Sequence, residues 1–384
     1  MRRRPFGCIE KLPSGNYRAY WKNEGVVVRA PKTFPAKRAA EEWLAEQQTA
    51  LAAGKITPQT PTTAEAPPPM TLDQWQQIYL DRCKRDRSLS PKTIQTYLSG
   101  YRTHLKKPFG GRILSAITVE EIRDWYNNFN PYRLGARKSA YRTLSVFLGA
   151  AVREGLLEKS PARVRGAMSK TRRKPDDPRA IVVSPQQAQA IADAMPPNLA
   201  ITVLLGFWCS LRFGEITELR RKDIQWDRDG TQAVVQVRRA VQYAAGFGYV
   251  VGPPKTEAGV RDVTVPPSML KALREHLDDF VAADREALLV HSPAAATRWL
   301  SNNSLNHYFK KAVKSVPDLD QRFTFHGLRH SGLTYAGQCG ATLAELLARA
   351  GHTDVETVLV YQHATRERDA ALAERMSERG GLKT

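Results

Sequence analysis

The sequence has few cysteines and no long apolar run, and each shortage excludes a class of protein. The four cysteines among 384 residues lie far apart and form neither CxxC pairs nor a Cys/His metal pattern. This predicts free thiols in a reducing cytoplasm, with no structural disulfide and no metal site. The most apolar run, Leu199 to Leu211, is shorter than the roughly eighteen residues that a membrane span needs. No apolar stretch follows the basic N-terminus, so no signal peptide is expected.

Negative charge is also scarce. Lys and Arg number 58 against 38 Asp and Glu, which gives a formal net charge of +20. A chain this basic is attracted to phosphate backbones or to anionic membranes, largely independently of sequence. Hydrophobic residues still make up 42% of the chain, enough to build cores. No GxxxxGK[ST] loop is present, so no nucleotide-driven motor is indicated.

Two stretches divide the chain, and its length alone predicts two or three domains. TPQTPTTAEAPPPM is rich in proline, and SKTRRKPDDPR is charged and contains two prolines; both are typical of linkers. The predicted parts are a first domain (1–56), a linker (57–70), a second domain (71–168), a linker (169–179) and a third domain with a tail (180–384).

The positive charge is concentrated in the first two domains. Residues 1–55 carry 11 Lys and Arg against 5 Asp and Glu, and residues 70–177 carry 22 against 10. From residue 178 onward the numbers are 25 and 22. We therefore expect the first two domains to grip DNA and the third to carry the chemistry.

The first domain is predicted to be a small three-stranded sheet with one helix. Apolar and polar residues alternate through Tyr17–Trp21, a further strand is expected around Val26–Arg29, and Lys37–Leu51 has helical spacing. Such a unit serves either as a structural cap or as a DNA-reading sheet. Its charge, and the basic residues interleaved with aromatics, favour DNA reading, with Arg18 and Tyr20 as candidate contacts.

The second domain is predicted to be helical throughout. Capping signals at Thr71, at Ser90-Pro91 and at Thr118 each precede apolar residues at helical spacing. A fourth helix is expected from about Ala136 to Glu154. The basic helix faces are either solvated surface or a DNA clamp, and the excess of positive charge favours the clamp. Its candidate DNA contacts are Lys92, Arg137, Lys138 and Arg142.

The third domain is predicted to mix helices with a few strands. It begins with a capped helix at Ser184 and an apolar helix around residues 199–209. Strand-like segments follow at Ala233–Val241, Tyr249–Val251 and Arg261–Val265, and helices are expected from there to the end.

Four motifs in this domain resemble those of the tyrosine recombinase, or phage integrase, family, and they occur in the family's order. They are CSLRFGEITEL with Arg212 and Glu215, PPKTEAGVRDVTVP with Lys255, HGLRHS with His326 and Arg329, and AGHTDVETVLVYQH with His352 and Tyr361. Each motif alone is weak, but their order behind a basic helical domain is hard to obtain by chance.

The resemblance also extends to the other two domains. Residues 1–51 are similar to the family's arm-binding domain, and the helical domain is similar to its core-binding domain. The implied fold is multidomain: a small β-sheet-plus-helix domain, an all-α SAM-like domain, and a mainly α (α+β) catalytic domain with a small antiparallel sheet.

The resemblance implies a role for each motif residue, and the chemistry explains the residue types. Attack on a phosphodiester places extra negative charge on the non-bridging oxygens, which arginine stabilises with fixed paired donors. Arg212 and Arg329 are expected to form this clamp, and Tyr361 is expected to be the nucleophile. The tyrosine hydroxyl has an unperturbed pKa of about 10 and needs a cation or a base nearby, which His326 is expected to supply.

Three further residues complete the expected site. Lys255, in the turn between two strands, is the candidate general acid for the leaving 5′ oxygen. His352 is expected to add a hydrogen bond to the phosphate. Glu215 is expected to orient the site rather than to transfer protons. His330 and His363 are interpreted as structural, and Tyr335 as a core residue.

The family reaction needs no cofactor and no metal, because the phosphotyrosine link conserves the bond energy. The implied partners are double-stranded DNA at core and arm attachment sites and three further copies of the chain in a tetramer. A host DNA-bending factor and an excisionase are further candidate partners. The protein itself is expected in the cytoplasm of the host cell, associated with the nucleoid. The amphipathic tail after Thr365 is expected to pack either on its own subunit or on a neighbour.

Two alternative functions remain open on the sequence. A type IB topoisomerase uses a similar clamp and tyrosine but reseals the same strand; the arm-like domain and the HxxR…GH…Y spacing disfavour it. A non-catalytic DNA-binding regulator on the same scaffold is expected to lack a catalytic residue, and none is missing here.

Overall fold

A computed structural model describes most of the chain in two compact units. The described residues are 6–11, 16–23, 26–53, 69–169, 181–351, 353, 373–374 and 376–378. The first unit contains Met1–Tyr79, His104–Arg137 and Tyr141–Val164, and the second contains Leu80–Thr103, Lys138–Ala140 and Arg165–Thr384. Most of both predicted linkers, His352, Tyr361, His363 and nearly all of the predicted tail lie outside the described residues.

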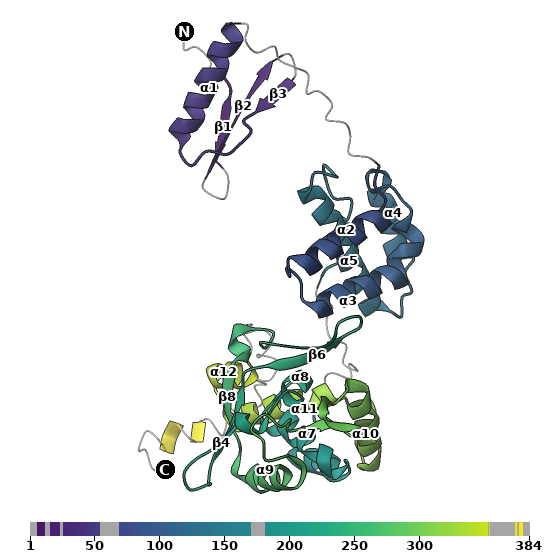
Figure 1. Cartoon of the computed structure of the whole chain (residues 1–384), viewed down its shortest axis with the longest axis vertical. Coiled ribbons are helices and arrows are strands. Elements are labelled where there is room, and N and C mark those ends of the chain that lie inside the picture. The colour runs from purple at the N-terminus through teal and green to yellow at the C-terminus, as the bar shows by residue number, and fades with distance from the viewer. Residues whose placement is uncertain are drawn as a thin grey trace. The chain divides into compact units, whose positions relative to one another are not determined.

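The N-terminal part is a three-stranded antiparallel sheet covered by one helix, as predicted (Figure 1). Its elements are β1 (Cys8–Lys11), β2 (Tyr17–Asn23), β3 (Val26–Arg29) and α1 (Lys37–Ala52). Because side chains alternate along a strand, Ala19 and Trp21 face one side, where they are buried with Ala40 and Leu44 of the helix. This alternation directs Arg18 and Tyr20 to the opposite face.

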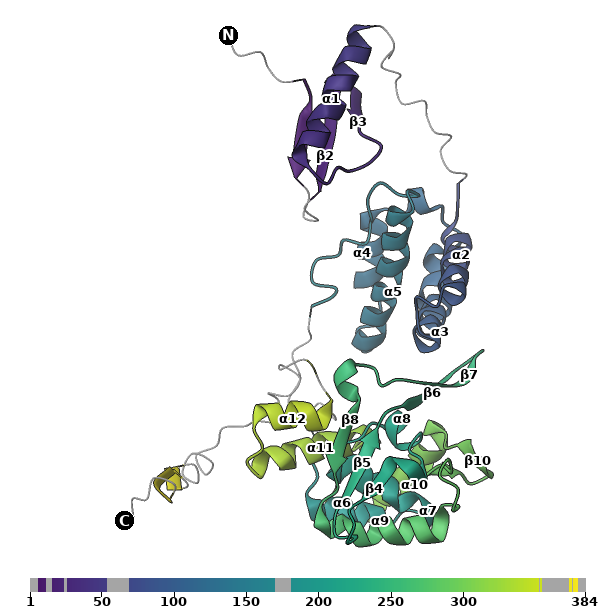
Figure 2. The same cartoon turned by 60° about the vertical axis from the view of Figure 1, so that its left-hand side comes forward.

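The next part is helical, and its helices begin where the capping signals predicted. Its elements are α2 (Leu72–Arg85), α3 (Pro91–Gly100), a π-helix (Tyr101–Gly110), a short 3₁₀ helix (Leu114–Ala116), α4 (Val119–Asn127) and α5 (Leu134–Arg153). The Ser90 hydroxyl accepts a hydrogen bond from the Thr93 N–H, and Thr118 forms a reciprocal capping box with Glu121. Figure 2 shows α4 beside α5, where the Tyr126 and Tyr141 rings lie 5.4 Å apart.

One feature of this part departs from the prediction. The apolar spacing that follows the cap at Ser90 continues through Tyr101 and Leu105, as in one α-helix. In the structure the α-helix ends at Gly100 and continues as a π-helix that contains Pro108. Proline has no N–H to donate to the previous turn, so it removes one α-type hydrogen bond and favours a locally widened helix.

The C-terminal part mixes helices with small antiparallel sheets. Its elements are α6 (Pro185–Asp193), α7 (Pro197–Trp208), α8 (Phe213–Ile216), β4 (Ile224–Trp226), β5 (Ala233–Val237), β6 (Ala240–Ala244), β7 (Gly248–Gly252), β8 (Arg261–Thr264), α9 (Pro267–Phe280), β9 (His291–Ser292), β10 (Ala295–Trp299), α10 (Asn302–Ser315), α11 (Phe325–Gln338) and α12 (Leu343–Ala350). Strands β4, β5 and β8 form one sheet, β6 pairs with β7, and β9 pairs with β10.

Three details of these strands differ from the prediction. The first is β4, a strand of three residues that was not expected. The strand expected over Ala233–Val241 is two strands, because the chain leaves the first sheet after Val237 and enters the β6–β7 hairpin at Ala240. The β9–β10 hairpin was not predicted, because β9 has two residues, too few to show a period of two.

The core of this part is centred on the apolar helix α7, and it fixes the approach of α11. Gly332 of α11 lies so close to α7 that an added Cβ would stand 1.9 Å from the Phe207 carbonyl oxygen. Only glycine permits this crossing. The close contact brings the HGLRHS segment of α11 against the end of α7, where the CSLRFGE segment begins.

No helix in the described part of the chain is long and apolar enough to cross a membrane.

Candidate active site

The first motif lies at the end of α7, where the chain turns sharply. Ser210 adopts a left-handed backbone conformation with φ of 53°, and the turn makes Arg212 the N-cap residue of α8. The Arg212 backbone N–H and its guanidinium both donate to the Glu215 carboxylate, at 2.9 and 2.7 Å. The Arg212 side chain stays 26% exposed while that of Glu215 is 2% exposed. Glu215 therefore holds Arg212 from beneath and leaves part of it open to solvent.

Arg261, which the sequence analysis did not single out, holds the same carboxylate from the other side. Its guanidinium donates to both Glu215 oxygens, at 2.9 and 3.3 Å, from strand β8. Burial alone would raise the pKa of the Glu215 carboxyl, but the hydrogen bonds and charge of Arg261, together with Arg212, hold that pKa below its usual value. The sequence did contain a signal for the burial of Arg261. Side chains alternate along a strand, so Arg261 lies on the same, inward face of β8 as Val263.

Arg329, the fourth residue of the HGLRHS segment in α11, is almost completely buried, at 2% exposure. Its guanidinium donates to the backbone carbonyls of Ser210 and Ala350, so it joins the end of α7 to the end of α12. A guanidinium held on two sides in this way is a fixed positive charge, which is the preorganisation that a phosphate clamp requires.

His326 lies one turn before Arg329 on α11, as its spacing predicted. The side chain keeps an exposed surface. Even so, the protein atoms around the ring displace solvent and lower the pKa of the imidazole, and the positive charges of Arg329 and Arg212 lower it further. The ring is therefore held in its neutral form at neutral pH, which is the form that can accept a proton.

The C-terminal end of α12 receives donors from several of these residues. The Arg349 carbonyl accepts from Arg261 at 2.9 Å, and the Ala350 carbonyl accepts from Arg329. The Gly351 carbonyl accepts from Arg212 at 3.3 Å and from the Thr256 hydroxyl at 3.2 Å. Three successive carbonyls at the negative end of a helix are thus each bound by an arginine. His352 follows directly in the sequence, and Tyr361 is ten residues beyond Gly351.

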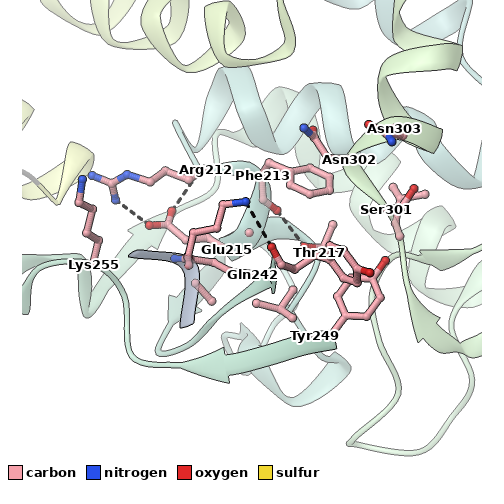
Figure 3. Close-up of a pocket in the computed structure, with 16 residues that line it drawn as sticks. Arg212, Phe213, Glu215, Thr217, Gln242, Tyr249, Lys255, Ser301, Asn302 and Asn303 are labelled. Carbon is pink, nitrogen blue, oxygen red and sulfur yellow. Dashed lines mark hydrogen bonds and ion pairs between the residues drawn. The ribbon is translucent and has the colours of Figure 1, made fainter. Parts of the chain in front are cut away.

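Lys255 lies in the turn between β7 and β8 and lines the same pocket as Arg212 and Glu215. Figure 3 shows these three residues at one end of the pocket and Tyr249 with Ser301 at the other. The structure therefore gathers five of the seven predicted site residues: Arg212, Glu215, Lys255, His326 and Arg329. The other two, His352 and Tyr361, lie outside the described residues.

The neighbouring residues interpreted as structural have packing partners. Tyr335 is partly buried and packs against Phe207 and Trp208, with ring centroids at 6.1 and 5.9 Å. His330, next to Arg329 on α11, is half-buried and has a contact partner.

The predicted DNA contacts fall into exposed and packed groups. Arg18, Lys92 and Arg142 are exposed on β2, α3 and α5, whereas Tyr20 is half-buried. Arg137 is also half-buried, with its guanidinium carbon 4.4 Å from the centre of the Tyr126 ring.

Lys138, also half-buried, donates to the Ser169 carbonyl. Arg137 and Lys138 thus have structural contacts that the sequence did not indicate.

A second buried carboxylate, Glu218, lies close in sequence to Glu215 and was also missed. It accepts hydrogen bonds from Arg220 at 3.0 Å, from Arg239 at 3.3 Å and from the Trp299 indole at 2.7 Å.

In the described part of the chain no group of three or more His, Cys, Asp or Glu residues is arranged to hold a metal ion.

Three family models match the chain along most of its length. The phage integrase N-terminal domain matches residues 5–53, the phage integrase N-terminal SAM-like domain matches residues 71–130, and the phage integrase family model matches residues 182–368. The chain belongs to the phage integrase family. These matches confirm the predicted family and fold class, and they identify the enzyme as a tyrosine-type site-specific recombinase.

Relatives of this integrase are known from mycobacteria and their phages. The putative prophage phiRv2 integrase of Mycobacterium tuberculosis (strain H37Rv) is 34% identical over 377 residues, which cover 98% of this chain and 96% of the relative. The integrase of Mycobacterium phage L5 is 31% identical over 385 residues, covering 98% and 99%. The function is thus that of a phage integrase, a recombinase that integrates prophage DNA.

Solved structures share the fold at lower identity. The Tn1549 transposon integrase, in complex with a circular intermediate DNA, has a TM-score of 0.63 at 18% identity over 80% of this chain and 99% of that one. A lambda integrase dimer bound to a COC′ core site has a TM-score of 0.55 at 19% identity, covering 94% and 97%.

Proposed function

We propose that this integrase cleaves DNA through Tyr361, with Arg212 and Arg329 holding the scissile phosphate. The Tyr361 oxygen forms a bond to phosphorus, the bond to the 5′ oxygen breaks, and a 3′-phosphotyrosine and a free 5′ hydroxyl result. The tyrosine proton passes to neutral His326, and Lys255 donates a proton to the leaving oxygen. In the second step the 5′ hydroxyl of the partner strand attacks the phosphotyrosine, and the proton transfers reverse.

The observation that carries this proposal is the unbalanced positive charge around Glu215. Arg212 and Arg261 contact that carboxylate, and Lys255 lines the same pocket. Among the described residues, these three cations and the one carboxylate leave positive charge available for an anion. A phosphodiester whose charge grows during attack is the anion that such a site stabilises best. His352, directly after Gly351, is proposed to add a hydrogen bond to the phosphate.

The nucleophile is tested by trapping the covalent adduct on a nicked core-site substrate whose cleaved end diffuses away. Tyr361→Phe is expected to abolish the adduct while DNA binding stays near wild type, because only the hydroxyl is lost. Tyr335→Phe is the matched control and is expected to form the adduct normally, since this ring packs against Phe207 and Trp208. An adduct formed by Tyr361→Phe but not by Tyr335→Phe would reverse the assignment.

We further propose that the chain works as a tetramer on paired DNA sites. Residues 71–168 and 180–384 would hold the core site, and residues 1–56 would read a separate arm site through the sheet face that carries Arg18 and Tyr20. Support comes from the domain matches and from the solved lambda integrase tetramer bound to a Holliday junction. A domain tethered in this way raises avidity through its effective concentration.

A truncated protein that starts at Met70 tests the role of the first domain. It is expected to form the adduct on a short core site as the full chain does, and to lose efficient recombination on a long substrate with flanking arm sequences. Footprinting of both proteins on the long substrate is the measurement. Identical footprints with equal recombination would show that the first domain does not read arm sites.

A further inference from the structure

Arg261 is a buried arginine in a strand where an aliphatic residue would suffice for packing. Its side chain is 5% exposed, and it points inward in phase with Val263. Burying a charged pair costs desolvation energy that its mutual attraction often fails to recover, so a buried pair is weak evidence for a stabilising role. The position of Arg261 therefore calls for an explanation beyond stability.

The contacts of Arg261 join three separate segments of the catalytic domain. The guanidinium donates to Glu215 in α8, to the Gly259 carbonyl in the segment after Lys255, and to the Arg349 carbonyl in the last turn of α12. Each of these segments leads to a proposed site residue: Arg212, Lys255 and Tyr361. A planar guanidinium with donors in fixed directions can hold three such acceptors at once, whereas an ammonium group has no fixed fork.

The contact with α12 gives Arg261 a further effect. The last carbonyls of a helix have no partner within the helix, and here they are bound by Arg261, Arg329 and Arg212 in turn. The point at which the chain leaves α12 is thus fixed against two arginines of the proposed phosphate clamp. Tyr361 follows ten residues later in the sequence. The fixed position of the end of α12 therefore limits the positions that the proposed nucleophile can reach.

We propose that Arg261 is a positioning residue for strand cleavage. It fixes the Glu215 carboxylate so that Arg212 is aligned for the phosphate, and it holds the end of α12 from which the nucleophile segment departs. It does not touch the DNA itself. This inference rests on the roles proposed above for Arg212 and Tyr361.

The central test is Arg261→Met, measured as single-turnover adduct formation at saturating protein, with core-site affinity measured in parallel. The rate is expected to fall about 100-fold while affinity stays within threefold, because a displacement of about 1 Å at a reacting group has an effect of that size. Arg261→Lys is expected to fold as wild type and to fall about tenfold, since lysine can reach Glu215 without also holding the α12 carbonyl.

Arg221→Met is the matched control for loss of a helix-end arginine. Arg221 donates to the carbonyls of Val281 and Ala282 at the end of α9, at 2.7 and 2.8 Å, and to the Leu277 carbonyl. Within the described part of the chain, none of its hydrogen-bond acceptors is a site residue. It is expected to lower thermal stability while cleaving at the wild-type rate on saturating DNA. A similar loss in both variants would show that Arg261 acts through stability alone.

A second pair of measurements isolates the path through Arg212. If Arg261 acts through Glu215, the double variant Arg261→Met/Glu215→Gln, which removes both buried charges, is expected to cleave no more slowly than Arg261→Met. Replacing one non-bridging oxygen by methyl removes the phosphate charge that Arg212 is proposed to hold. The Arg261→Met loss is therefore expected to shrink on a methylphosphonate substrate, as the Arg212→Lys loss should.

The inference is overturned if Arg261→Lys folds as wild type and cleaves within threefold of it, or if the Arg261 and Glu215 losses multiply. Arg212→Lys in the same assay separates this outcome from failure of the proposed function. If Arg212→Lys is impaired and the Arg261 variants are not, only the positioning role is wrong. If Arg212→Lys also cleaves at the wild-type rate, the proposed phosphate clamp itself is wrong.

Discussion

Two buried carboxylates three residues apart, Glu215 and Glu218, are each held by two arginines, yet their surroundings differ in charge balance. Around Glu218 the cations are matched: Arg220 also pairs with Glu286, and Arg239 also pairs with Asp223. Around Glu215 the arginines turn their other donors to uncharged carbonyls of α12. The same residue types thus build a neutral structural cluster in one place and a cationic site in the other. The difference in charge balance, rather than the number of arginines, supports the proposal that a phosphate binds beside Glu215 and not beside Glu218.

The largest expected difference between the two clusters is in catalysis. Arg212→Lys and Arg329→Lys are each expected to lower the single-turnover cleavage rate by about 100- to 1000-fold, because lysine cannot offer two fixed donors to a developing oxyanion. Arg220→Lys, in the neutral cluster, is expected to change it less than threefold. Adduct formation at saturating protein measures all three. Equal effects at Arg212 and Arg220 would show that the Glu215 and Glu218 clusters do not differ in their contribution to catalysis.

The pH dependence of cleavage sharpens the comparison at His326. Its pKa lies below the ordinary 6.5, because the ring is partly desolvated and lies near Arg329 and Arg212. The neutral form that accepts the proton is then complete above that value and is lost only as the pH falls through the lowered pKa. The rate at subsaturating DNA is expected to stay level from about pH 8 to 6.5 and to decrease only at lower pH, approaching tenfold per pH unit once the pH is below the lowered pKa. A decline that starts above pH 6.5 would contradict this assignment.

The neutral cluster is expected to affect stability instead. Glu218→Gln removes the negative charge that two arginines contact, and it replaces one of the two oxygens that accept from these arginines and from the Trp299 indole by an NH2 donor. The free energy of unfolding is expected to fall by about 2 kcal/mol, the usual range for buried hydrogen bonds to a charged group. Denaturant unfolding measures the loss, and cleavage at saturating DNA should be unchanged. A catalytic defect without a stability defect would place Glu218 in the site.

The smallest expected effect is at the turn between α7 and the cationic site. Ser210 has a φ of 53°, and its buried hydroxyl has no hydrogen-bond partner among the residues that the structure describes. Ser210→Gly removes both the backbone strain and the unpaired hydroxyl, and is expected to stabilise the protein by about 1 kcal/mol. The backbone carbonyl that binds Arg329 is retained, so cleavage should stay within twofold. A loss of stability in thermal unfolding would show that the turn is not strained.

The parts of the structure that sequence predicted are those decided by neighbours in the chain. The helix starts at Ser90 and Thr118 follow from caps that act within three residues. Arg212 with Glu215, and His326 with Arg329, are likewise spaced by one helical turn. The relative positions of the residues in each of these pairs therefore follow from the sequence alone.

The parts that sequence missed depend on contacts between distant segments. Arg261 reaches Glu215 across 46 positions of sequence and the Arg349 carbonyl across 88. Nothing near Arg261 shows which acceptors it will meet. The π-helix at Pro108 was missed for the opposite reason, because its cause is local but α-helical periodicity conceals it.

The two backbone contacts of Arg329 bear on how the sequences of inactive prophage integrases are interpreted. Arg329 joins the ends of α7 and α12 through two carbonyls, so a descendant that only binds DNA still needs it to fold. The Tyr361 hydroxyl is proposed to act in cleavage, and drift can remove it once recombination is no longer selected. In a lineage of remnant integrases, an intact HxxR box therefore records a preserved scaffold. The tyrosine is the residue whose loss dates the end of mobility.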